Sequence, residues 1–252
     1  MFDLQKASML KRVPAWMLDA VLFLCLAAGF MALLGSGLQV DTHTKELDAI
    51  YVKYEETYDI SFTITQEDYE KLNKEEKAAY DAAADALAKD MEAQRTYEMV
   101  LNMTILTLSI SLLATYFILE FLIPLWLKNG QTLGKKVFSI GVMRTDGVKI
   151  TPFMLFARTI LGKYTLETMI PVMLLLMLLF GIVGLEGVMI IGLILLLQVI
   201  IMIATRTNSA IHDLVACTVT VDLASQMIFD SPEARLEYQK KLQADEAANA
   251  DY

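Results

Sequence analysis

The sequence has 252 residues, of which 56% are hydrophobic and 20% charged, and its formal net charge is −9. Soluble domains average about 45–50% apolar residues. The excess here is concentrated in blocks long enough to cross a bilayer, which requires about 20 residues. A soluble core could not use such blocks without exposing them, so the composition excludes a soluble globular protein.

Cysteine and histidine are few and scattered. Cys25 and Cys217 lie far apart, and the sequence contains no Cys-x-x-Cys pair and no Cys/His cluster. A structural zinc site needs four ligands, and only His43 and His212 could add to the cysteines. We interpret both cysteines as small apolar residues and expect no disulfide, no metal site and no cofactor.

The first apolar block covers about residues 17–38 and follows the basic residues Lys6, Lys11 and Arg12. Signal peptides have shorter apolar cores, of about 7–15 residues. We therefore expect residues 1–38 to form a cytoplasmic N-terminus and a retained transmembrane helix, and not a cleaved signal.

Residues 39–99 form an acidic region with 16 acidic and 7 basic side chains. Thr65 followed by three polar residues, two of them acidic, is typical of a helix start. Residues 75–91 are rich in Ala, Glu and Lys, which favour helix. We therefore expect a largely helical insert, a hairpin whose last arm continues into the membrane.

A second apolar block, about residues 100–127, opens the membrane region that we assign to residues 100–222. The basic segment 128–165 follows, with seven Lys or Arg side chains against one Asp. Within it, an Asp-Gly pair suits a tight turn between two short strands, 137–143 and 148–150. This pattern predicts a small β-hairpin.

Residues 152–163 have the pattern of an amphipathic helix. Its apolar side chains share one side, and Arg158 and Lys163 are placed to reach lipid headgroups. We interpret this segment as an interfacial helix that lies along the membrane surface before the next span begins.

Residues 166–205 are almost continuously apolar. One helix of that length would be about 60 Å long, twice the thickness of the hydrocarbon core. The chain must therefore turn back, and the glycine-rich segment 181–187 separates two spans, about 166–183 and 187–205. The polar residues 223–252 form a tail.

Lys and Arg in short flanking segments mark the cytoplasmic side of a membrane. The N-terminal stretch and segment 128–165 are both basic, so both should face inward. The acidic insert then faces outward and the tail returns inside. The predicted fold is an all-α membrane protein with four transmembrane helices, both termini in the cytoplasm, an acidic, largely helical extracytoplasmic insert and a small cytoplasmic β-hairpin.

Ionisable residues within the spans are functional candidates, because each is costly unless paired or hydrated. Arg12 and Asp19 are seven residues apart and share one helix face, and Asp19 lies about 10 Å deeper. Glu120 lies eight residues, about 12 Å, before Lys128 at the same border. If Asp19 and Glu120 face each other, they could hold a cation or share a proton. The alternative is that Asp19 pairs with a basic residue and Glu120 with a hydroxyl or amide.

Three short motifs, in order, resemble a known family. RxxAxxxD opens the first span at residues 12–19, GQTLGKK follows the second span at 130–136, and IHDLVA occupies 211–216. In this order and at these membrane positions they resemble the RDD family of bacterial membrane proteins. In that family the residue after the last alanine is usually glycine, and here it is Cys217.

The family is named for one arginine and two aspartates, which map by motif to Arg12, Asp19 and Asp213. The resemblance implies a multi-pass protein of the bacterial cell membrane. The family has been proposed to transport solutes, and some members resemble cation/proton antiporters in activity. The candidate transport or charge network combines these residues with ionisable neighbours: Arg12, Asp19, Glu120, Lys135, His212 and Asp213.

Within this network, His212 titrates near neutral pH in principle. As a structural latch, Asp213 would hold Arg12 or Lys135, and as a gate the same contacts would break during transport. The GQTLGKK segment is not a nucleotide loop, because that loop needs four residues between the glycines and Ser or Thr after the lysine. We expect no nucleic-acid partner, and lysines that contact anionic headgroups.

Two functions from different classes remain open. One is a small transporter, with cation/proton exchange as one form, in which a homo-oligomer could supply walls that four spans lack. The other is a non-transporting scaffold that recruits partners through the insert and the tail. A water-filled cavity reaching Asp19 would favour transport, and a dry, fully paired Asp19 the scaffold. We expect no enzyme, because no Ser or Cys has a base nearby in the sequence.

Overall fold

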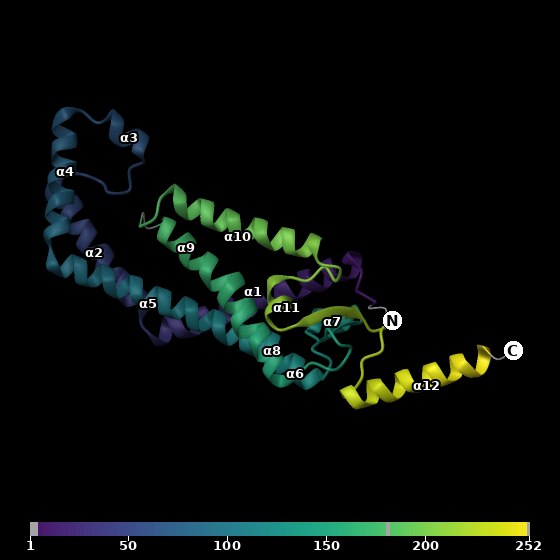
Figure 1. Cartoon of the computed structure of the whole chain (residues 1–252). Helices are drawn as coiled ribbons and strands as arrows, with labels where there is room; N and C mark the ends of the chain where they lie inside the picture. Colours follow the sequence, from purple (N-terminus) through teal and green to yellow (C-terminus); the bar gives the residue numbers. More distant parts are fainter. Residues whose placement is uncertain (1–4, 180–181, 251–252) are drawn as a thin grey trace. The chain divides into compact units, whose positions relative to one another are not determined.

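The computed structural model describes residues 5–179 and 182–250. Its contacts divide the chain into two units, one made of Met1–Ala27 with Leu112–Tyr252 and the other of Ala28–Ser111. In the described part, four helices are long and apolar enough to cross a membrane, as the sequence predicts (Figure 1). They are Met9–Gly37, Met91–Leu127, Pro152–Leu179 and Leu185–Ala204.

The unit Ala28–Ser111 contains the acidic insert, which is helical as predicted. Its helices are α2 (Val40–Tyr58), α3 (Gln66–Lys71) and α4 (Lys74–Lys89), and α2 packs against α4. Thr65 caps α3 by accepting a hydrogen bond from the Asp68 N–H. The side of the membrane on which this unit lies stays a prediction.

The other unit holds the third and fourth spans, the start of the first span and the end of the second. Two of the four spans contain π-helical segments, in which the backbone hydrogen bond runs from residue i to i+5. The elements of the spans are α1 (Met9–Gly37), α5 (Met91–Tyr116), η1 (Phe117–Leu122), α6 (Ile123–Leu127), α8 (Pro152–Phe156), η2 (Ala157–Met169), α9 (Ile170–Leu179) and α10 (Leu185–Ala204). The shorter or terminal elements are α7 (Leu133–Val137), β1 (Ile140–Arg144), α11 (Ile211–Val215), β2 (Thr218–Asp222) and α12 (Pro232–Ala250).

The third span differs from its prediction. It starts at Pro152, so the segment interpreted as an interfacial helix is its first part. Arg158 does not reach toward headgroups, because its side chain is 2% exposed. Lys163 is also turned inward, onto a carboxylate. In the sequence these two positive charges argued against a transmembrane helix. In the structure each is paired with a carboxylate from another element, Asp213 or Glu120.

The predicted β-hairpin is largely replaced by a long-range sheet. β1 pairs antiparallel with β2, from Ile140 opposite Asp222 to Arg144 opposite Thr218. The tight turn does form, with Gly147 at a positive φ, but its return strand is reduced to an isolated bridge. β1 pairs with β2 and not with residues 148–150 because β2 contains alternating Thr and Val, a pattern that favours strand, and its first four residues are buried.

The dry core of this unit lies at the sheet and not among the membrane helices. Val142, Met143, Val219 and Val221 are all fully buried. By contrast, little of α1 and α10 is buried, and their apolar side chains point outward, as a surrounding bilayer requires. The sheet is therefore the most completely buried part of this unit, and α7, α11 and the Arg12 side chain contact it.

Cys217 lies between α11 and β2 with φ of 50°, a left-handed conformation that costs a residue with a side chain about 1–2 kcal/mol. This is the position at which the resemblance led us to expect glycine. We expect Cys217→Gly to stabilise the protein by about 0.5–1 kcal/mol, after allowing for the greater freedom of glycine in the unfolded chain. The thermal midpoint of purified protein in detergent measures this. Cys217→Ala keeps a Cβ and should give no such gain, and equal effects of the two variants would contradict the explanation.

Candidate functional site

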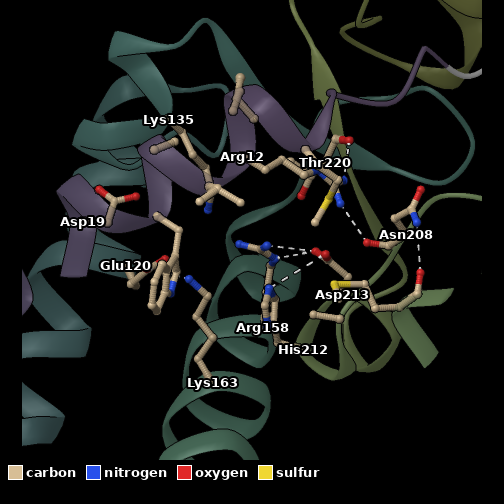
Figure 2. Close-up of a pocket in the computed structure, with 17 residues that line it drawn as sticks. Arg12, Asp19, Glu120, Lys135, Arg158, Lys163, Asn208, His212, Asp213 and Thr220 are labelled. Atoms are coloured by element: carbon tan, nitrogen blue, oxygen red, sulfur yellow. Dashed lines mark hydrogen bonds and ion pairs between the residues drawn. The ribbon is translucent and has the colours of Figure 1, made fainter. Parts of the chain in front are cut away.

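A cavity of about 250 Å³ lies at the polar end of α1. The polar residues that line it come from both ends of the chain and from the segments between the spans (Figure 2). They are Arg12, Asp19, Glu120, Lys135, Arg158, Lys163, Asn208, His212, Asp213 and Thr220. All six candidate residues from the sequence are therefore brought to one cavity.

Asp213 is held by Arg158 in a buried ion pair. Nε and Nη2 of Arg158 donate to Asp213 Oδ1 over 3.0 and 2.8 Å, and Thr218 donates to the same oxygen over 3.1 Å. The two charged side chains are 2% and 4% exposed. Burial alone would raise the pKa of Asp213, but the positive charge of Arg158 outweighs it and holds that pKa well below its usual range.

Arg12 does not hold Asp213, contrary to the latch predicted from the sequence. Its guanidinium donates to three backbone carbonyl oxygens, those of Asn208 at 2.7 Å, Thr207 at 3.4 Å and Thr220 at 2.9 Å. It therefore ties α1 to the loop that follows the last span and to β2. Lys135 is not the partner of Asp213 either, because Asp213 is taken by Arg158.

Asp19 joins α1 to the GQTLGKK segment. It accepts hydrogen bonds from the Thr132 hydroxyl at 2.5 Å and from the Gly134 N–H at 2.7 Å. A Cβ at Gly134 would lie 2.2 Å from the carbonyl oxygen of Ala15, so the close approach of α7 to α1 requires glycine. In the structure, Asp19 thus has two neutral donors and not a basic partner.

Glu120 and Lys135 supply the unsatisfied atoms of the site. Glu120 Oε1 pairs with Lys163 Nζ at 2.5 Å, whereas its Oε2 is buried without a hydrogen-bond partner among the described residues. The Nζ of Lys135 is likewise buried and without such a partner. Burial, with repulsion from Lys163 and Arg158, lowers the pKa of Lys135 to about 7.

His212 is bound to Glu167 in the third span. Its backbone N–H donates to Glu167 Oε1 at 3.0 Å, and its Nδ1 lies 2.8 Å from Oε2. Burial and the nearby Arg158 lower the pKa of His212, which favours the neutral ring. A Cβ at Gly162 would lie 2.5 Å from the His212 Cβ, so α11 packs directly on η2 through that glycine.

Sequence reasoning missed three members of this network: Arg158, Lys163 and Glu167. A signal was present, because they are spaced by five and four residues, close to one π-helical turn. That spacing places them along one side of η2 once residues 152–169 are taken as one helix. Thr159 on the same segment donates to the backbone carbonyl of Glu120 at 2.8 Å, which links η2 to η1.

Four helices long and apolar enough to cross a membrane, together with a buried charge network, define the chain as an integral membrane protein. The model of the RDD family matches residues 6–217, most of the chain, and the chain belongs to that family. The match contains Arg12, Asp19 and Asp213, and it ends one residue before β2. No curated protein and no solved structure matches the chain.

Proposed function

We propose that this RDD protein transports a small solute or ion across the bacterial plasma membrane, coupled to protons, with both termini in the cytoplasm. The observation that carries the proposal is the cavity, which reaches Asp19 and holds two buried ionisable atoms without hydrogen-bond partners among the described residues, Lys135 Nζ and Glu120 Oε2. Buried ionisable groups without partners are costly, and in membrane proteins they are kept mainly where ions or protons move. The proposal assigns no enzymatic reaction to the site.

Coupling to protons is supported by Lys135. Because its pKa is lowered to about 7, the ammonium can gain and lose a proton near neutral pH. Glu120, with one oxygen on Lys163 and one free, can exchange that partner for a passing ion or proton. A homo-oligomer would add walls to the path that one chain of four spans encloses.

The alternative is a scaffold that transports nothing and recruits partners through the insert and the tail. The scaffold function is favoured because the other charged side chains of the site already have partners within the chain. Asp19 has two donors, and Arg158 is paired with Asp213, so these contacts serve equally well to lock the membrane region together. Only a flux measurement separates the two functions.

The test is flux in proteoliposomes that contain a trapped pH dye. We expect a change in internal pH when the chloride salts of Na⁺, K⁺ or Li⁺ are added outside. Glu120→Gln and Asp19→Asn should reduce the rate at least tenfold, because each removes a carboxylate from the cavity. Glu98→Gln is the matched control, since Glu98 is exposed in the same helix as Glu120. No flux from folded, oriented protein would sink the transport proposal.

A further inference from the structure

The charges of the cavity lining do not balance. It contains four cationic side chains, Arg12, Lys135, Arg158 and Lys163, against three carboxylates, Asp19, Glu120 and Asp213. With Lys135 protonated and His212 neutral, the lining itself carries a charge of +1, and Glu167, which holds His212 from outside the lining, adds one negative charge. Two of the cations are matched within the lining, Arg158 by Asp213 and Lys163 by Glu120.

Outside the two ion pairs, the buried polar atoms of the lining that have no hydrogen-bond partner among the described residues are donors. Asp19 has both oxygens occupied by neutral donors. Arg12 is held by carbonyl oxygens, which satisfy its donors without cancelling its charge, and its Nε has no hydrogen-bond partner among the described residues. Lys135 Nζ has none either. Among the described residues, Glu120 Oε2 is a buried acceptor without a hydrogen-bond partner, which a water molecule can satisfy.

We propose that the cavity binds a small monovalent anion, a halide or a short carboxylate, at the Lys135 ammonium, in a lining that also contains the Arg12 guanidinium. A volume of about 250 Å³ holds such an ion with a few water molecules, each of which takes about 30 Å³ in the liquid. This inference rests on the proposed transport function and names the class of its solute.

Binding of the anion takes up a proton. The anion favours the charged form of Lys135, so it raises a pKa that in the empty site is about 7. One anion and one proton then enter together, and the charge of the cavity is unchanged. The charged and titratable groups of the lining around Lys135 are Lys163 and Arg158 on η2, Glu120 on η1, Arg12 and Asp19 on α1, and His212 and Asp213 on α11.

The experiment measures thermal midpoints of the full chain in detergent at constant Na⁺. Sodium chloride and sodium acetate are compared with sodium gluconate, whose anion is much larger than either. We expect chloride, acetate or both to raise the thermal midpoint. The anion concentration needed for a given rise should be at least tenfold lower at pH 6 than at pH 8.5. The two small anions distinguish a halide site from a carboxylate site.

The variants make this result specific to Lys135. In Lys135→Met the anion response should be lost, and in Lys136→Met, an exposed neighbour in the same helix, it should match the wild type. Lys135→Arg keeps the charge but does not titrate near neutral pH, so it should respond equally at pH 6 and pH 8.5. An undiminished response in Lys135→Met, or no response in the wild type, overturns the inference.

The inference and the proposed function fail separately. Cation-dependent flux in liposomes without anion binding would overturn the anion site and leave transport standing. Anion binding without flux would keep the site and remove transport. A midpoint that follows Na⁺ at constant anion concentration would show a cation site instead.

Discussion

Replacement of Arg158 by methionine is expected to destabilise the protein by about 3–5 kcal/mol, because it leaves the Asp213 carboxylate buried without its counter-charge. Methionine fills a similar volume, so little of the loss should come from packing. For a chain of this size the thermal midpoint should fall by roughly 10 °C or more. The midpoint of detergent-purified protein, followed by the size-exclusion peak that survives heating, measures it.

The pH dependence of this loss follows from Asp213. In the wild type its folded pKa lies below the unfolded value, so its contribution is present above the unfolded pKa and is lost as the pH falls through the folded pKa. In Arg158→Met the largest of the causes that lower this pKa is gone and burial is opposed only by the more distant charges of His212 and Lys135, so we expect the carboxyl to take up a proton at mildly acid pH. The variant should therefore lie closer to the wild type at pH 5 than at pH 8.

A double variant separates charge from packing. Arg158→Met with Asp213→Leu removes both buried charges, and replacement of a buried ion pair by apolar residues is often neutral or stabilising. We expect it to recover most of the stability lost in the single variant. If the double variant is as unstable as the single one, the cost of losing Arg158 lies in packing against α11 and not in an orphaned charge.

Replacement of Lys135 by methionine should stabilise the protein, whereas the same replacement of Arg158 destabilises it. Lys135→Met removes a buried ammonium that has no hydrogen-bond partner among the described residues, and we expect a gain of about 1–3 kcal/mol near pH 6. The folded pKa of about 7 lies below the unfolded value, so the cost of the charge is full below pH 7 and declines as the pH rises toward the unfolded pKa. The advantage of the variant should shrink over that range.

Lys136→Met provides the control for this prediction. Lys136 is the next residue in α7 and is exposed, so its replacement should change stability by less than about 0.5 kcal/mol at any pH. Thermal midpoints of both variants and the wild type between pH 6 and pH 9 test the expectation. A loss of stability in Lys135→Met would contradict this expectation and mean that Nζ has a partner in the folded protein.

The four spans and the family could be predicted because they depend on local signals. Blocks of about 20 apolar residues identify the spans wherever they occur. Three ordered motifs were enough for the family, which its own model confirms over residues 6–217. The start of α3 was also predictable, because Thr65 and the acids after it form a cap within one turn.

The pairing of charges could not be predicted, because each partner lies far away in the sequence. Arg158 and Asp213 are 55 residues apart, and a hydropathy pattern counts the arginine against a span whether or not it is paired. The strand β2 was missed for a related reason. The Asp-Gly turn offered β1 a nearby partner, whereas its main partner comes from the C-terminal part of the chain.

These pairings also fix an order of events during synthesis. Chains emerge and insert from the N-terminus, so Arg12 and Arg158 enter the membrane before residues 207–220, which supply most of their partners, have been made. Until then the third span carries an arginine that Asp213 has not yet neutralised. The membrane region can therefore reach its final form only when the segment from α11 to β2 has packed against the earlier helices and supplied these partners.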